Sequence, residues 1–144
     1  MISQTAEYAL RAVCALAMHP GVPLITHRLA ELTKVPPGYL SKVMQALVRA
    51  GLVSSQRGLG GGFALVRSPA EISVFDVVES VDPLQRIHTC PLGLAAHGVR
   101  LCPLHKRLDD AMRTVEEAFR QSTLAELLAD PNPSVPLCGF PPVK

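Results

Sequence analysis

Hydrophobic residues recur at helical spacing along the first third of the chain and predict three helices. The first covers 6–18 and ends at a segment that contains Pro and Gly. The second is short, at 26–34, and we expect Thr26 to be its N-cap. The third is longer, at 37–51, and Gly51 is placed to end it. The last two helices, joined by a tight break, are the parts of a helix-turn-helix.

The third predicted helix has two faces of different character. The face that we expect in the core carries Leu40, Val43, Met44 and Leu47. The opposite face is polar and basic, and its members are Gly38, Ser41, Lys42, Gln45 and Arg49. Such a helix can bury one face in a small domain and present the other to DNA.

The segment 52–67 contains two strand-like runs around a glycine-rich centre and predicts a β-hairpin. The glycines permit positive φ and keep the tip slim, and they are Gly58, Gly60, Gly61 and Gly62. A phosphate-binding loop is excluded, because no Lys-Ser or Lys-Thr follows them and a strand comes next instead of a helix. With a short strand near Ile25, the element order is that of a winged helix-turn-helix.

The second half of the chain predicts three more helices. Two begin at capping boxes, formed by Ser73 with Asp76 and by Thr123 with Glu126. Between them a longer helix starts at Pro103, and its hydrophobic stripe consists of Leu104, Leu108, Met112, Val115 and Phe119. A small winged domain cannot cover this stripe from one side, so we expect two copies to pack together as a homodimer, with folding back onto the same domain as the alternative.

The expected fold is mainly α with a small β-hairpin wing, that is, a winged helix-turn-helix plus a long C-terminal dimerisation helix. The expected divisions are a DNA-binding domain at 1–84, a Cys/His loop at 85–103, the dimerisation helix with the short terminal helix at 104–130, and a tail at 131–144. Five prolines in that tail predict an extended or disordered segment.

Composition indicates a folded cytoplasmic protein. The 144 residues are 48% hydrophobic, which is ample for a core. No stretch approaches the roughly 20 apolar residues that cross a bilayer, and Glu7 and Arg11 stand where a signal peptide would be apolar. The four cysteines of a cytoplasmic chain are expected to be thiols, metal ligands or redox sensors instead of disulfides.

Charge is divided unevenly between the two halves. Residues 1–67 hold seven Lys/Arg against two Asp/Glu, and the remainder is acidic. A basic front half favours a polyanion such as nucleic acid as partner, with a simply solvated charged face as the alternative, and the helix-turn-helix makes double-stranded DNA the expected polyanion. On the third helix Ser41, Lys42 and Gln45 are placed to reach base edges or phosphates in the major groove. Arg57, beside the glycine tip, suits a narrow minor groove.

The run LTKVPPGYLSKVMQALVRAGLVSSQRGLGGGFALVRSPAEISVFDVVESVD resembles the DNA-binding region of the Rrf2 family of bacterial transcription regulators, and the likeness extends over about residues 1–128. This family includes the iron-sulfur cluster regulator and the nitric-oxide-sensitive repressor. The resemblance implies a homodimer that binds pseudo-palindromic promoters, here expected as a repressor. It also implies DNA contacts by Ser41, Lys42 and Arg57, whereas Gln45 rests on the helical face alone.

The loop CPLGLAAHGVRLCPLH, at 90–105, is where cluster-binding members of the family carry three cysteines, the last in a C-P-x-H context. Cys90 matches the first, and Cys102 with His105 matches the last. The middle cysteine is missing, and His97 stands near its place as a candidate nitrogen ligand. Glu7 holds the position from which some members recruit an acid of the partner subunit, although it also suits a solvated first turn.

Four interpretations of this loop remain open. It could hold an iron-sulfur cluster and sense redox state, nitric oxide or iron-sulfur supply. It could be a cluster-free thiol switch of Cys90 and Cys102, with Cys138 as a further thiol. Its cysteines could simply be small packing residues, as we expect for Cys14 in the first helix. It could also bind a structural zinc. An enzyme is not expected, because the loop lacks an acid placed as general base and the chain contains no HExxH or GxSxG motif.

Overall fold

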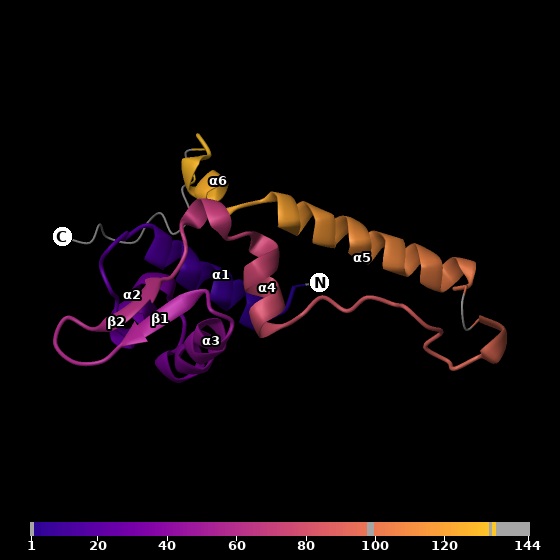
Figure 1. The fold of residues 1–144 in the computed structure, drawn as a ribbon, viewed down its shortest axis with the longest axis horizontal. Helices are drawn as coiled ribbons and strands as arrows, with labels where there is room; N and C mark the ends of the chain where they lie inside the picture. Colours follow the sequence, from indigo (N-terminus) through magenta and orange to yellow (C-terminus); the bar gives the residue numbers. More distant parts are fainter. Residues whose placement is uncertain (1, 98–99, 133, 135–144) are drawn as a thin grey trace.

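The computed structural model describes residues 2–97, 100–132 and 134, with His97 described by its backbone alone. Among these residues helices predominate, and the two strands form one antiparallel hairpin (Figure 1). In chain order the elements are α1 (Gln4–Ala17), α2 (Thr26–Thr33), α3 (Pro37–Arg49), β1 (Val53–Gln56), β2 (Gly62–Leu65), the short 3-10 turn η1 (Pro69–Glu71), α4 (Val74–Val81), the 3-10 turn η2 (Ala95–His97), α5 (Pro103–Gln121) and α6 (Leu124–Ala129). The predicted fold class is confirmed.

The local signals of the sequence account for most helix ends. Both predicted capping boxes form, at the start of α4 and at the start of α6. Gly51 follows the C-cap of α3 with φ 78°, the left-handed conformation that glycine adopts most easily. The prediction for Thr26 is wrong. Ile25 is the N-cap of α2, because Leu24 is held in an extended bridge to Phe63 and the helix starts directly after it.

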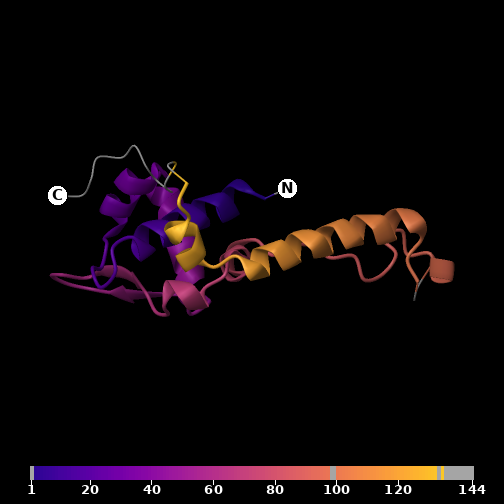
Figure 2. The ribbon, with the colours of Figure 1, turned by 90° about the horizontal axis from the view of Figure 1, so that it is seen from above.

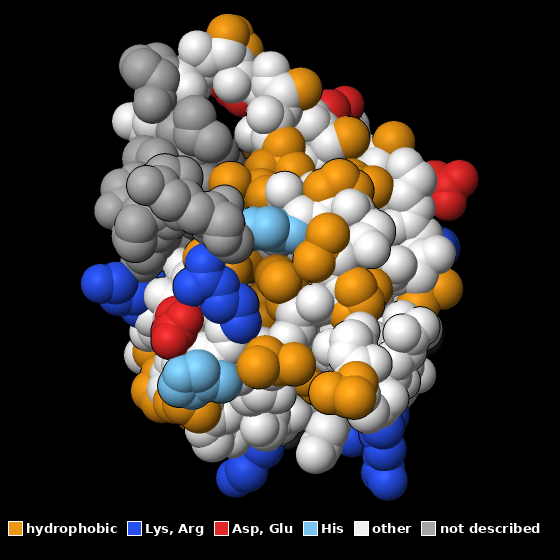
Figure 3. Space-filling model, turned by 90° about the vertical axis from the view of Figure 1, so that its left-hand side faces the viewer, with side chains coloured by type: hydrophobic (Ala, Val, Ile, Leu, Met, Phe, Trp, Pro, Cys, Tyr) orange, Lys and Arg blue, Asp and Glu red, His pale blue; other side chains and the backbone are white. Residues whose placement is uncertain are grey.

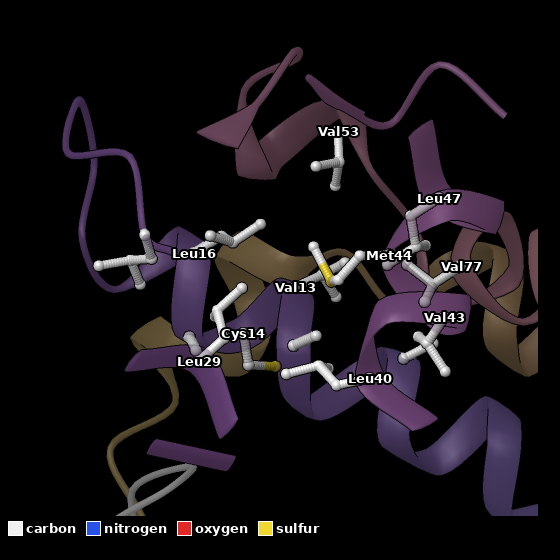
Figure 4. Close-up of a cluster of buried hydrophobic side chains, with 14 of the residues drawn as sticks. Val13, Cys14, Leu16, Leu29, Leu40, Val43, Met44, Leu47, Val53 and Val77 are labelled. Carbon is white, nitrogen blue, oxygen red and sulfur yellow. The ribbon is translucent and has the colours of Figure 1, made fainter. Parts of the chain in front are cut away.

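The core is built around α1, which contacts α2, α3, α4, α6 and β2. Figure 4 shows side chains of α1, α2 and α3 meeting there, among them Val13, Leu29 and Met44. Cys14 is buried in the same cluster, as predicted, and burial raises the pKa of its thiol. The hydrophobic face of α3 is therefore fixed against α1, which leaves the opposite face outside.

The long helix α5 projects from this body as an arm (Figures 1 and 2). The chain runs outward from α4 to the far end of the arm, and α5 returns toward the body. All nineteen residues of α5 are described, and none of them is buried. Leu104, Leu108 and Val115 of the predicted stripe are exposed, whereas Phe119 at the inner end packs against α4.

The short helix α6 belongs to the body. Leu124 is fully buried in the core, and its backbone N–H donates to the carbonyl of Ile72 at 2.9 Å. A second backbone bond joins Val74 to Ser122 at 2.8 Å. The hydrophobic side of α6 packs onto η1 and α1. The outer part of α5 is thereby isolated as the projecting element. In the described ranges, no helix has the length and apolar character needed to span a membrane.

Candidate nucleic-acid interface and Cys/His loop

The outer face of α3 carries the predicted DNA contacts in accessible positions. Lys42 and Gln45 are exposed, and neither makes a hydrogen bond or ion pair with other described residues. Ser41 is half-buried, and its hydroxyl donates to the carbonyl of Pro37 at 3.1 Å. Its oxygen still has lone pairs that can accept a hydrogen bond. The face therefore offers a cation, an amide and a hydroxyl oxygen to a ligand along one side of the helix.

Aromatic contacts fix the start of α3 against α1. The rings of Tyr8 and Tyr39 meet edge to face, with centroids 5.3 Å apart, and the hydroxyl of Tyr39 forms a hydrogen bond with Thr5. Arg11 lies over the Tyr8 ring and donates to the carbonyl of Thr33 at the end of α2. Sequence reasoning missed this cluster, because Thr5 and Tyr39 are 34 residues apart. It holds the N-terminal end of the helix that carries Ser41 and Lys42.

The wing is a short hairpin with a glycine tip. Val53 pairs with Leu65 and Gln56 with Gly62, so only the intervening segment forms the tip. Its inner end is tied to the body through Leu24 and Phe63, whose backbones exchange hydrogen bonds of 2.9 and 2.8 Å. Arg57 leaves β1 at the beginning of the tip, is exposed, and makes no ion pair within the described residues. Its guanidinium is available to a partner.

Figure 3 looks onto the wing end of the molecule. Lys and Arg side chains project from the lower edge, which is the side on which Figure 1 places α3. Hydrophobic side chains spread over the centre of this view. The hairpin sequence from Val53 to Leu65 contains no Asp or Glu. The wing and the edge near α3 therefore present a surface suited to a polyanion.

The Cys/His loop brings one predicted pair together. Cys102 is the N-cap residue of α5, and its Sγ lies 3.3 Å from Nδ1 of His105 in the first turn of that helix. Cys90 lies in a turn closed by a hydrogen bond from Gly93 N–H to its carbonyl, and it is buried with 8% of its surface exposed. The side chain of His97 and all of Cys138 lie outside the described residues.

The described side chains of one chain do not assemble the donor set that a cluster or a zinc ion needs. Within the described residues, no three His, Cys, Asp or Glu groups come close enough to hold a metal ion. Glu7 lies in the first turn of α1 and pairs with Arg11 at 2.9 Å. Among the predicted ligands that are described, Cys102 and His105 are in contact with each other. This pair alone does not fit an iron-sulfur cluster, which is held by about four protein ligands.

Arg86 clasps the start of the loop to the side of α5. Its guanidinium donates to both carboxylate oxygens of Asp109, at 2.7 and 2.9 Å, and to Glu116 at 3.2 Å. The backbone N–H of Ile87 donates to Asp109 as well, at 2.9 Å. These hydrogen bonds, that of Arg86 foremost, hold the pKa of Asp109 well below its usual range. Sequence reasoning missed the clasp, since Arg86 and Asp109 stand 23 residues apart.

The clasp continues to the body through the inner end of α5. Arg120 donates to Glu116 at 3.0 Å and lies over the ring of Phe75 in α4, with 3.7 Å to the ring centroid. The hydrogen bonds from Arg120 and Arg86 lower the pKa of Glu116. A chain of contacts thus joins the loop, the arm and α4, which packs on α3 and α1.

Comparison with known proteins gives one consistent family. The model of the Rrf2 family, described as an iron-dependent transcriptional regulator, matches residues 2–130. A protein of Aquifex aeolicus named as an HTH-type transcriptional regulator is 27% identical over 131 residues, which are 89% of this chain and 91% of that protein. A Mycobacterium tuberculosis protein named in the same way is 34% identical over 131 residues, covering 88% of this chain and 80% of its own.

Solved structures agree with that family in fold. IscR of T. potens superposes with a TM-score of 0.74 at 26% identity and covers 92% of this chain and 88% of its own. CymR, the global cysteine regulator of B. subtilis, gives a TM-score of 0.72 at 25% identity and covers 88% of this chain and 95% of its own. The family consists of transcriptional regulators and not of enzymes, and it includes iron-sulfur regulators such as IscR. With its winged helix-turn-helix and a family match over residues 2–130, this chain belongs to the Rrf2 family of transcriptional regulators.

Proposed function

We propose that this protein binds double-stranded promoter DNA as a homodimer and represses transcription there, which places it in the cytoplasm with the chromosome. In this proposal α3 enters the major groove with Ser41, Lys42 and Gln45, and the wing places Arg57 in the adjacent minor groove. The observation that carries it is the exposed outer face of α3 beside a wing without acidic residues. The cations Lys42 and Arg57 are unpaired in the described residues and can bind phosphates or bases without first breaking an internal ion pair.

A salt-controlled titration tests the DNA contacts. Duplexes selected from a random pool by the wild-type protein serve as probes, and fluorescence anisotropy measures affinity over a range of salt concentrations. Lys42→Ala and Arg57→Ala should each weaken binding and reduce the salt slope by about one. Arg57→Ala should lose most on sites with narrow A·T tracts. Arg113→Ala removes the same charge from the exposed face of α5 and is the matched control. Unchanged affinity in both variants at low salt would overturn the assignment.

The homodimer rests on the exposed stripe of α5. Leu104 and Leu108 are 62% and 49% exposed, and both belong to the first half of α5, the helix that forms the projecting arm (Figure 1). A second copy of the same helix would cover this stripe in an isologous contact and would set two α3 helices a fixed distance apart. That arrangement matches a pseudo-palindromic operator.

We infer that the Cys/His loop is the signal-responsive segment, sensing redox state, nitric oxide or iron-sulfur status. Support comes from its place, because Cys102 begins α5 and the Arg86 clasp ties the other end of the loop to the same helix. The Cys102–His105 contact favours thiol chemistry within one chain. Hydrogen peroxide would convert the Cys102 thiol to a sulfenic acid and release water. The additional polar atoms at the start of α5 would then change how the loop packs on the arm.

Elemental analysis of protein purified without oxygen separates the candidate chemistries. Visible absorption with iron and sulfide would select a cluster, whose further ligands would come from Cys90 and His97 of the same loop or from Glu7 of a partner subunit. Zinc alone would select a structural site. Protein without cluster or zinc would leave thiol chemistry or cysteines that only pack. Cys102→Ala should abolish the difference in DNA affinity between oxidised and reduced samples, while the exposed loop control Leu92→Ala should keep it. If wild-type affinity is the same in both samples, the loop has no sensing role.

A further inference from the structure

Beyond Arg57, the tip of the wing presents a single side chain. Residues 58–62 are Gly-Leu-Gly-Gly-Gly, so Leu59 is the one residue there that has a side chain. Its relative exposure is 109%, the highest among the exposed large hydrophobic residues of the described chain. It belongs to neither hydrophobic cluster of the described residues. A leucine in this position contributes no core packing among the described residues, and its apolar surface is available to a partner.

The glycines around Leu59 are fixed in place by the fold. Gly58 and Gly60 have φ values of 93° and 74°, which L side chains rarely adopt. A Cβ on Gly61 would stand 2.4 Å from the carbonyl oxygen of Gln56. One on Gly62 would stand 2.7 Å from the carbonyl carbon of Leu24. The close backbone packing and the hydrogen bond of 3.0 Å from Gly61 N–H to the carbonyl of Gly58 make the tip a defined platform that carries Leu59 outward.

Charge and shape together favour DNA as the partner of this tip. Arg57 precedes Leu59 by two residues and is exposed and unpaired within the described residues. The hairpin contains no acidic side chain that would repel phosphates. A tip without flanking side chains is slim enough for the minor groove, which is about 6 Å wide in B-form DNA. An apolar side chain that enters this groove between two base pairs unstacks them in part and bends the duplex toward the major groove.

We propose that Leu59 is an apolar wedge that inserts into the minor groove at each half-site and bends the DNA. Arg57 binds the minor groove through its positive charge. Leu59 makes affinity depend on how easily the two base pairs at its position unstack. Flexible pyrimidine–purine steps such as TA and CA are therefore the preferred steps at the position of Leu59. The proposal rests on the DNA-binding function proposed above, and it adds a specificity determinant that acts through DNA deformability.

The test compares the full-length wild-type protein with Leu59→Ser and Leu59→Met on duplexes selected from a random pool by the wild type. Anisotropy gives the affinity, and energy transfer between dyes at the two duplex ends gives the bend. Leu59→Ser should lower affinity by about tenfold, as expected for the loss of one buried apolar side chain, and should straighten the DNA. Leu59→Met should retain both properties. Neither variant should shift the melting temperature, because Leu59 lies outside the core clusters.

Two further readouts separate a wedge from a general contact. Leu59→Ser should leave the salt slope of binding unchanged, since no phosphate contact is lost, whereas Arg57→Ala should reduce it. Replacing the preferred TA or CA step by a stiff A-tract step should weaken the wild type and leave Leu59→Ser unaffected.

The outcomes distinguish this inference from the proposed function. A wild-type protein that binds none of the selected duplexes overturns both. A wild type that binds, with Leu59→Ser bending and binding the same DNA equally well, overturns the wedge alone and leaves the proposed DNA binding in place.

Discussion

The two longest helices of the protein are opposites in their surroundings. α1 has fourteen residues, of which eight are buried, and other elements of the same chain surround it. α5 has nineteen residues, all described, and none is buried although its hydrophobic stripe is equally regular. The difference shows that an amphipathic pattern predicts a helix and its hydrophobic face but does not predict what covers that face. For α1 it is the chain itself, and for α5 we propose a second copy.

The largest effect is expected from a charge placed on the stripe of α5. Leu108→Glu would bury a carboxylate in the proposed dimer contact, which desolvation opposes. Sedimentation equilibrium should show dimers for the wild type and monomers for the variant. Affinity for a duplex with two half-sites should fall by roughly 100-fold or more, because the second half-site loses its high effective concentration. Arg113→Glu, a charge change elsewhere on the same helix, is the control. If Leu108→Glu is still a dimer, a second copy does not cover the stripe of α5.

Shortening a buried side chain of the body and an exposed one of the loop compares how tightly the two regions are packed. Leu47 of α3 is fully buried, and Leu47→Ala should lower the free energy of unfolding by about 2–5 kcal/mol through lost burial and a cavity. Leu92→Ala, at an exposed position of the loop, should change it by about 0.5 kcal/mol at most. Urea unfolding measures both. Equal costs would mean that the loop is packed as tightly as the body.

Two glycine substitutions in the wing should have smaller effects on stability and can be compared directly. Gly62→Ala places a methyl group against the backbone of Leu24 at a φ of 140°, and it should cost about 1–3 kcal/mol. Gly60→Ala meets only the strain of its positive φ, since nothing lies within 4 Å, and it should cost about 1 kcal/mol. Thermal unfolding of the two variants gives the difference. If Gly62→Ala is the milder one, the bridge between Leu24 and Phe63 does not constrain the wing.

Loss of the Arg86 clasp should loosen the start of the loop locally and should affect the stability of the whole protein less. Arg86→Met removes the hydrogen bonds to Asp109 and Glu116 while keeping much of the apolar stem. Amide exchange at Ile87 should accelerate, because its N–H bonds to the same carboxylate. Exchange within α1 should stay the same, and Arg113→Met serves as the control on the outer side of α5. Unchanged exchange at Ile87 would show that the loop is held by other contacts.

The pH dependence of the clasp follows from the lowered pKa of Asp109. A carboxyl group whose folded pKa lies below its unfolded value contributes stability above the unfolded value, and this is lost as pH falls through the folded pKa. The clasp should therefore persist at pH 4, close to the ordinary value of 3.8. The carboxyl ¹³C shift of Asp109 should titrate below 3.8 in the wild type and nearer to it in Arg86→Met. Identical titration curves would contradict the attribution to Arg86.

Local signals explain why much of the fold could be predicted from sequence. Capping boxes such as Ser73 with Asp76 involve residues three apart, and a glycine that ends a helix acts on its own backbone. The misplaced N-cap at Thr26 has the opposite cause, because a bridge from Leu24 to Phe63, far along the chain, decides where α2 begins. The candidate contacts on α3 and the wing were predicted because helical spacing and hairpin geometry fix their faces, and their binding to DNA stays a prediction.

The sequence by itself determined the helices, the wing, the family resemblance and the donor groups of the Cys/His loop, since each depends on residue types at short spacing. Only the tertiary structure decided that α6 returns to the body, that α5 stands out as an arm, and that Arg86 ties the loop to it. It also decided which donors meet, since Cys102 contacts His105 while Glu7 is paired with Arg11. The physical reason is that contacts between distant residues depend on how whole elements pack.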